Sequence, residues 1–230
     1  MSDDEDKKYE IDDFAFLGRT FTEYQQIFDF DPANWAGKRV LDCPAGPCSF
    51  VAEAHNHGIE AIGVDKMYDR SPAALSKVCA EDIETAMNAL DGVEDLYVWD
   101  FYDDTSELRT YRERAATRFL SDYSHNSDRY VSANLPATPF ADQVFDLVLS
   151  AHFLFLYDDR LSHEFHLETT RELLRISNQL RVFPLHGFDA NQSELVAELI
   201  QNLRSEGYST DIREVPFEFQ RGANKMLVVE

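Results

Sequence analysis

Two carboxylates and one glycine follow two neighbouring apolar runs, close to where each run ends. Asp42 ends an apolar run, Gly46 lies in the turn that follows it, and Asp65 ends the next apolar run, 19 residues beyond Gly46. A sharp turn whose backbone approaches a ligand favours glycine. An acid about 20 residues further along accepts hydrogen bonds from ribose hydroxyls in dinucleotide-binding folds. Either acid could instead only cap a helix or end a strand, but together they predict a cofactor site.

The turn itself distinguishes two kinds of cofactor. Residues 42–48 read D-C-P-A-G-P-C, with Gly46 as the single glycine. Nicotinamide cofactors need a G-x-G-x-x-G turn that presents their pyrophosphate to the N-terminus of a helix. The single glycine therefore disfavours NAD and fits a cofactor without phosphate.

Short apolar runs that alternate with helical patterns would position these residues. We predict strands at Lys38–Cys43, Glu60–Asp65, Arg129–Asn134, Val144–Ser150 and Gln179–Pro184, then a strand pair at Tyr208–Val215 and Lys225–Glu230. Helices are expected at Ser49–His57, Arg160–Ile176 and Gln192–Ser205. This alternation predicts an α/β fold, a doubly wound sheet with helices on both faces and ligands at the carboxyl ends of the strands.

Residues 66–129 are predicted to form a helical insertion between the second and third strands. Helical spacing covers Pro72–Leu90 and Ser106–Tyr123, and connections at this place are usually much shorter. The aromatic side chains of the insertion could line a substrate pocket or add a layer of core. Residues 1–10 read as an acidic tail, and 11–230 as one domain that opens with one or two short helices.

Three motifs resemble, in the same order, those of class I S-adenosylmethionine-dependent methyltransferases. They are the turn after the first strand, the G-V-D of residues 63–65, and residues 133–150, whose P-F-A-D-Q-V-F-D-L-V-L-S run is the strongest. The resemblance covers about residues 38–185, and the D-C-P-A-G-P turn is typical of a subgroup of uncharacterised methyltransferase-like proteins. It implies a Rossmann-like seven-stranded sheet in the order 3-2-1-4-5-7-6, with the seventh strand antiparallel, and S-adenosyl-L-methionine as cofactor.

The resemblance also implies roles for single residues. Asp42 and Gly46 match the acid and the middle glycine of the family's D-x-G-x-G-x-G turn, whereas Pro44 and Cys48 replace its outer glycines. Asp65 would accept from the ribose hydroxyls. Asn134 could accept from adenine through its amide oxygen, or be only a turn residue. Further cofactor contacts are expected from Pro44, Ala45, Ser150, Leu135 on the adenine face, and Arg19 on the cofactor carboxylate, unless Arg19 forms a surface salt bridge.

His152, directly after the fourth strand, is the candidate general base, although it could equally be a structural histidine. The chain lacks a Pro-Cys nucleophile after the fourth strand, and it also lacks the motif of methyltransferases that act on base amines. The magnesium pattern of catechol methyltransferases is missing as well, and we expect no metal. His163 and His166 form an i, i+3 pair that could bind a metal but is more typical of a solvated face. We predict in-line methyl transfer to a small molecule, achieved by positioning and desolvation.

Three other functions stay open. A methyltransferase acting on RNA or protein would carry the same motifs. A non-catalytic protein that only binds S-adenosylmethionine would explain the altered turn. An acidic interaction module without a cofactor would show no rise in melting temperature when S-adenosylmethionine is added.

The charge of the chain limits its partners. The 43 acids against 21 lysines and arginines give a net charge of −22 and a pI of about 4.5, which argues against nucleic acid and anionic membranes. Acids spread along the whole chain, with only 6 lysines, favour adaptation to a salty cytoplasm over a DNA mimic. Neither a secretory signal nor a membrane-spanning run is visible, and Cys43, Cys48 and Cys79 read as cytosolic thiols. The oligomeric state stays open.

Overall fold

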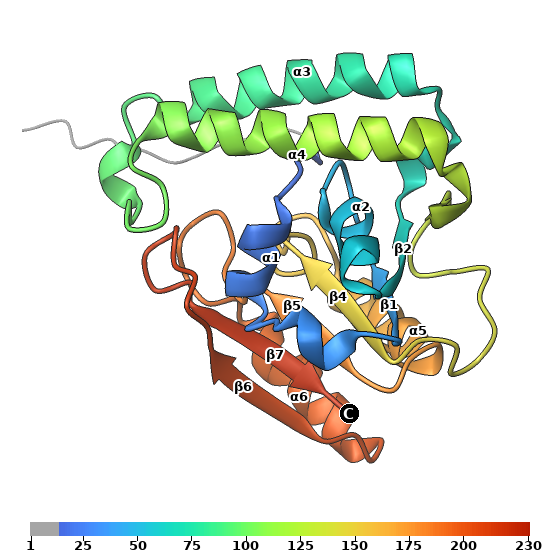
Figure 1. Cartoon of the computed structure of the whole chain (residues 1–230). Helices are drawn as coiled ribbons and strands as arrows, with labels where there is room; N and C mark the ends of the chain where they lie inside the picture. Colours follow the sequence, from blue (N-terminus) through green and yellow to red (C-terminus); the bar gives the residue numbers. More distant parts are fainter. Residues whose placement is uncertain (1–13) are drawn as a thin grey trace, which may run out of the picture.

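Residues 14–230, which the computed structural model describes, are organised around a mixed sheet with the strand order β3-β2-β1-β4-β5-β7-β6 (Figure 1). The acidic tail predicted for residues 1–10 lies outside the described residues. The strands are β1 (Arg39–Asp42), β2 (Glu60–Val64), β3 (Tyr130–Val131), β4 (Leu147–Ala151), β5 (Leu180–Phe183), β6 (Thr210–Glu214) and β7 (Lys225–Val229).

Parallel pairing joins β1 to β2 and β4, β2 to β3, and β4 to β5. In contrast, β7 runs antiparallel to both β5 and β6. The strand order and the antiparallel β7 confirm the fold predicted from the sequence. The carboxyl ends of β1, β2 and β4 meet at one edge of the sheet, at the point where the strand order reverses, and ligands of doubly wound sheets bind at such an edge.

Helices cover both faces of the sheet (Figure 1). They are α1 (Phe21–Ile27), α2 (Phe50–Ala54), α3 (Pro72–Leu90), α4 (Thr105–His125), α5 (His163–Arg175) and α6 (Leu195–Ser205). Alternate side chains of a strand point to opposite faces. In β4, Leu147 and Leu149 join the core beneath α1 and α2, whereas Val148 joins the core beneath α5 and α6. This strand is therefore apolar on both sides, as its sequence predicts.

The insertion between β2 and β3 is a pair of long helices that pack along one another (Figure 1). In α3, Ser71 caps the first turn by accepting the N–H of Ala74, and Pro72 occupies the first helical position, where its missing N–H costs nothing. Its buried stripe, Leu75, Cys79, Ile83, Ala86 and Leu90, recurs at helical spacing. The helix pair lies across the carboxyl edge of the sheet and contributes side chains to the site described below.

The third strand is shorter than the six residues predicted for it. β3 spans only Tyr130–Val131, because the chain turns soon afterwards: the carbonyl of Asn134 accepts the N–H of Ala137 at 3.0 Å. Asn134 and Leu135 therefore lie beyond the end of the strand. None of the helices within residues 14–230 has the length and apolar character needed to cross a bilayer.

The expectation of a solvated face for the His163 and His166 pair is wrong for one of the two. His166 is fully buried, and its ring nitrogens lie 2.9 Å from the carbonyls of Ser162 and Leu154. It ties α5 to the loop that follows β4. Within the described residues, no cluster of three or more metal-binding side chains occurs.

Candidate functional site

The turn after β1, residues 43–48, is fixed against the end of β2. Gly46 has φ +53°, a left-handed conformation that favours glycine. Its N–H donates to Asp65 Oδ2 at 3.0 Å, and the N–H of Ala45 donates to the carbonyl of Val64 at 2.8 Å. The hydroxyl of Tyr68 donates to the carbonyl of Gly46 at 2.5 Å. The backbone of the turn is thus held by both β2 and the segment that follows it.

Asp65 is the N-cap of the short 3-10 helix Lys66–Asp69. One carboxylate oxygen accepts the N–H of Gly46, and the other accepts the N–H of Met67 at 2.9 Å. Burial raises the pKa of Asp65, although the two backbone hydrogen bonds and Lys66 oppose this effect. A carboxylate has about four acceptor positions, so Asp65 can accept about two more hydrogen bonds.

Asp42 lies beneath the turn and is fully buried. Each of its carboxylate oxygens is 2.9 Å from the hydroxyl of Tyr24, which is also 3.3 Å from Cys48 Sγ. Burial raises the pKa of Asp42 well above its usual range, against the hydrogen bond from Tyr24 and with a further contribution from Asp65. Asp42 therefore joins α1 to the turn from below.

A cavity of about 750 Å³ opens at the carboxyl edge of the sheet, within the range of about 300–1,000 Å³ that is usual for small-molecule sites. Of the predicted site residues, its walls include Arg19, Pro44, Ala45, Gly46, Asp65, Asn134, Leu135 and His152. Asp42 and Ser150 do not line it. Ser150 is buried within β4, and its hydroxyl has no hydrogen-bond partner among the described residues.

Residues 14–19 form a cover over this cavity. The N–H of Ala15 donates to the hydroxyl of Tyr157 at 3.0 Å, and the N–H of Phe16 donates to Asp82 Oδ2 at 2.6 Å. A Cβ on Gly18 would lie only 2.0 Å from the carbonyl oxygen of Pro47, so this contact requires glycine. The cover is therefore held by α3, by the loop after β4 and by the turn.

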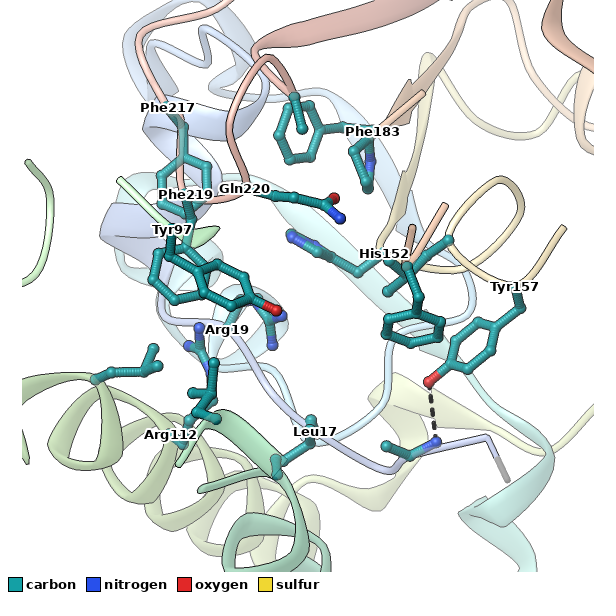
Figure 2. A pocket seen from close by; sticks show the side chains of 18 of the residues that line it. Leu17, Arg19, Tyr97, Arg112, His152, Tyr157, Phe183, Phe217, Phe219 and Gln220 are labelled. Atoms are coloured by element: carbon teal, nitrogen blue, oxygen red, sulfur yellow. Dashed lines mark hydrogen bonds between the residues drawn. The ribbon is translucent and has the colours of Figure 1, made fainter. Parts of the chain in front are cut away.

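A second chamber has a volume of about 110 Å³, and Figure 2 shows side chains that line it. The two share Ala15, Leu17, Arg19, His152 and Tyr157. Aromatic side chains from distant parts of the chain dominate the rest of the smaller chamber. They include Tyr97 of the insertion, Phe183 of β5, and Phe188, Phe217 and Phe219 from the loops that follow β5 and β6.

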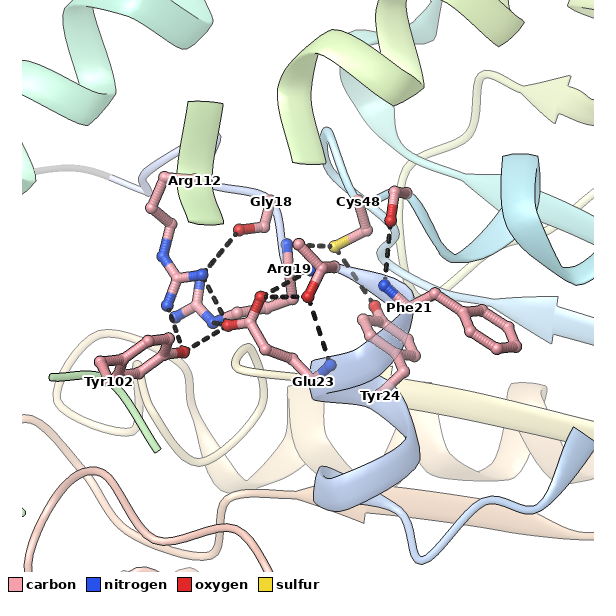
Figure 3. Close-up of polar contacts among 10 residues, drawn as sticks. Gly18, Arg19, Phe21, Glu23, Tyr24, Cys48, Tyr102 and Arg112 are labelled. Atoms are coloured by element: carbon pink, nitrogen blue, oxygen red, sulfur yellow. Dashed lines mark hydrogen bonds and ion pairs between the residues drawn. The ribbon is translucent and has the colours of Figure 1, made fainter. Parts of the chain in front are cut away.

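A buried ion network borders the smaller chamber (Figure 3). Arg112 of α4 donates to Glu23 Oε1 of α1 at 2.6 Å and to the hydroxyl of Tyr102 at 3.0 Å. Tyr102 donates a short hydrogen bond to Glu23. Arg19 Nε lies 3.8 Å from Glu23 Oε1, too far for a hydrogen bond. Two guanidinium groups thus share one carboxylate.

The network determines the ionisation of its members. Burial disfavours the charge on Glu23, but Arg112 and Arg19 hold its pKa below the usual range. Burial also disfavours the charge on Arg112, but Glu23 and Tyr102 raise its pKa. Burial and the neighbouring Arg112 lower the pKa of Arg19 despite Glu23. Within residues 14–230, Arg19 Nε is buried without a hydrogen-bond partner.

His152 stands where the two chambers meet. It follows β4 directly, has φ +52°, and donates its backbone N–H to the carbonyl of Phe183 at 2.6 Å. Its Nδ1 is buried and finds no hydrogen-bond partner in the described part of the chain. Burial, together with Arg19 and Arg112, lowers the pKa of His152 well below its usual value. The imidazole is therefore neutral at pH 7, and Nδ1 is available to a ligand.

Sequence reasoning missed Glu23 and Arg112, although Arg112 lines the smaller chamber and pairs with Glu23 behind it. Glu23 and Arg112 are separated by 89 positions, and no local pattern links them. One signal was present: Thr20 and Glu23 form a capping box at the start of α1, which predicts a partly satisfied glutamate at that helix end. The pairing with α4 follows from the packing of the insertion alone.

Comparisons with known proteins give one relative along nearly the whole chain. The uncharacterized protein MJ0045 of Methanocaldococcus jannaschii is 32% identical over 220 residues, which cover 95% of this chain and 97% of that protein. No protein-family model matches the sequence.

Among the solved structures that are similar at low identity are two methyltransferases. One is an S-adenosylmethionine-dependent methyltransferase from Aquifex aeolicus, at 13% identity and a TM-score of 0.39, with 91% of this chain and 94% of that chain covered. The other is magnesium protoporphyrin IX methyltransferase from Synechocystis PCC 6803 with bound S-adenosylhomocysteine, at 12% identity and a TM-score of 0.46, with 90% and 83% covered.

Proposed function

We propose that this chain, which belongs to the same family as the uncharacterized protein MJ0045 of Methanocaldococcus jannaschii, transfers a methyl group from S-adenosylmethionine to a small molecule. One observation carries the proposal. Asp65, at the carboxyl end of β2, has spare acceptor capacity and lines a cavity of about 750 Å³ together with the turn that its carboxylate holds. An acid in that position suits the two hydroxyls of a ribose.

The donor set of the cavity fits the cofactor. Asp65 would accept from both ribose hydroxyls, and residues 44–46 would support the amino-acid end of the cofactor with backbone. Asn134 and Leu135, which line the same cavity, would meet adenine with an amide oxygen and an apolar face. Asp42 and Ser150 do not line the cavity, so the expected direct contacts are not proposed for them. Asp42 instead positions the turn through Tyr24.

The bound cofactor would supply an electrophilic methyl group on a sulfonium. The protein would contribute positioning and the exclusion of water, which can account for a large share of the rate of such a displacement. The cover at residues 14–19 would close the cavity over the reactants. His152 would direct the acceptor from the junction of the chambers. Its depressed pKa makes the imidazole a weak base, so hydrogen bonding at Nδ1 is its proposed role, in preference to uptake of the acceptor's proton.

Arg19 lines both chambers. The expectation that it pairs with the cofactor carboxylate therefore competes with a role on the acceptor side. Arg19 does not form a surface salt bridge, because its side chain is only 14% exposed and its partner Glu23 is fully buried.

Methyl-labelled S-adenosylmethionine tests the proposal directly. The protein is incubated with this cofactor and with cell extract separated into small-molecule, protein and RNA fractions. We expect label to be transferred in the small-molecule fraction. Label in the RNA or protein fraction would support the macromolecular alternative instead. Binding of the cofactor without transfer to any fraction would support a non-catalytic protein, and a melting temperature unaffected by the cofactor would support an interaction module.

A further inference from the structure

The smaller chamber has walls that suit an aromatic ring. Tyr97 and Phe219 stack with centroids 4.5 Å apart, and Phe183 lies against His152 at 5.4 Å. Phe217 packs edge-on to Phe183 at 6.0 Å. An engineered apolar cavity of about 150 Å³ binds benzene. The chamber of about 110 Å³ is close to this size and shares part of its lining with the larger cavity, so it suits one ring. A nucleotide or a peptide would be too large for it.

The charge of the smaller chamber is positive, in contrast to that of the whole chain. Of the described side chains that line it, Arg19 and Arg112 carry a permanent charge, and none is a carboxylate. Its other titratable groups are Tyr97, Tyr157 and the neutral His152. Glu23, behind the chamber, is the one carboxylate that both guanidinium groups share. The buried cluster therefore keeps an excess of about one positive charge, which favours an anion.

Two unpartnered polar atoms border this chamber. Arg19 Nε and His152 Nδ1 are both buried, and neither has a hydrogen-bond partner within residues 14–230. Buried polar atoms are nearly always hydrogen-bonded in native proteins, so both atoms point to a ligand. A guanidinium N–H can only donate, and a neutral imidazole can carry its proton on Nδ1 and donate as well. The side chains of Arg19 and His152 line the same chamber, so an oxyanion bound there has two donors within its walls.

We propose that the methyl acceptor is a small phenol that binds in the smaller chamber as its phenolate, with the oxygen facing Arg19 and His152 (Figure 2). This inference rests on the proposed methyl transfer and names its substrate class. The phenol proton leaves to solvent on binding. An oxygen–carbon bond to the methyl group then forms as the sulfur–carbon bond breaks, and the electron pair of that bond stays on sulfur. The phenolate and the sulfonium thus become a neutral ether and a neutral thioether.

The probe is 4-nitrophenol, whose phenolate absorbs visible light whereas the phenol does not. With the protein present, we expect the phenolate band to develop about one pH unit or more below that of the free probe, because a neighbouring positive charge favours ionisation by this amount. Nitrobenzene has the ring without the hydroxyl and should bind more weakly. If the bound probe ionises at the pH of the free probe, or if nitrobenzene binds equally well, the inference is wrong.

Arg19→Gln tests the named partner. In this variant we expect the shift of the bound probe to be lost, Arg19→Lys to restore part of it, and Arg114→Gln, a variant at an exposed position of α4, to leave it unchanged. Calorimetry with S-adenosylhomocysteine separates the two proposals. If Arg19→Gln binds this compound with an affinity within about threefold of that of the wild type, the result supports the acceptor-side role of Arg19. A large loss of that affinity with the probe shift retained would assign Arg19 to the cofactor instead, and failure of the wild type to bind the compound would refute methyl transfer.

Discussion

Two buried acids at the ends of β1 and β2 differ in where their lone pairs point. Both oxygens of Asp42 lie 2.9 Å from the hydroxyl of Tyr24, inside the core. Those of Asp65 receive backbone N–H groups of Gly46 and Met67 while the side chain still lines the cavity. The structure thus distinguishes an acid whose oxygens are enclosed in the core from one that holds the turn and can also bind a ligand, a distinction that residue type and spacing do not make.

The stability of the Asp42→Asn variant relative to that of the wild type should increase as the pH rises. Burial raises the pKa of Asp42 well above its usual value of 3.8, so above that pH the unfolded chain loses a proton more readily than the folded protein does. The wild type therefore loses stability as pH increases, and the variant lacks this loss. Chemical denaturation at pH 5 and pH 8 measures the difference in unfolding free energy between the two proteins. The unfolding free energy of the variant relative to that of the wild type should be higher at pH 8 than at pH 5. An equal difference at both pH values would contradict the account.

At the scale of elements, the site depends on how the insertion meets the segment before β1. α4 reaches α1 through the ion pair between Arg112 and Glu23, whose charged atoms are 2.6 Å apart. The cover is bound to the turn through the N–H of Arg19, which donates to Cys48 Sγ at 3.1 Å. α4, α1 and the turn after β1 are distant in sequence but enclose one space. Loss of either contact should alter the position of the cover.

Glu23→Gln should destabilise the fold by about 3–5 kcal/mol, the usual cost of removing one member of a buried ion pair. The variant leaves two buried guanidinium groups without their carboxylate. Glu84→Gln is the matched control, because it removes the same charge from the exposed pair with Arg109, and exposed pairs contribute little. Urea denaturation compares the three proteins. Equal, small losses in both variants would show that the buried network does not stabilise the fold.

The sequence predicted features that depend on neighbours along the chain and missed those that depend on packing. The long helices of the insertion and the placement of Gly46 and Asp65 follow from local patterns and spacing, whereas the strand order was implied by the resemblance to methyltransferases. Arg112 lies on a helix whose sequence is polar for most of its length, and nothing local indicates that this arginine is 3% exposed. The solvated face expected for His166 fails for the same reason, since the loop after β4 covers that side of α5.

At the scale of the whole molecule, a net charge of −22 surrounds a buried cluster with an excess of positive charge. The acids are spread along the chain, and their mutual repulsion acts against the compact state. The field of the surface should also repel an anionic ligand on its way to the site. Salt would weaken both effects, because the Debye length falls to about 3 Å at 1 M. We propose on this basis that the protein is adapted to a saline cytoplasm.

The melting temperature should therefore rise from dilute buffer to molar KCl. Screening acts on charge, whereas an excluded osmolyte strengthens apolar burial alone. Sucrose is thus the control, and it should reproduce only part of the gain in melting temperature. A melting temperature that is flat with KCl, or a gain that sucrose reproduces completely, would refute the proposal of saline adaptation.

The central claim is that Asp65 holds the ribose of a bound S-adenosylmethionine, and calorimetry with S-adenosylhomocysteine tests it most directly. A hydrogen bond to a charged group contributes about 1.5–3 kcal/mol, so Asp65→Ala should lower the affinity about a hundredfold or more. Asp69→Ala is the matched control, because Asp69 is an exposed acid on the same short helix that does not line the cavity. It should bind as the wild type does. Equal affinities for the Asp65 and Asp69 variants would remove Asp65 from the site and contradict the account.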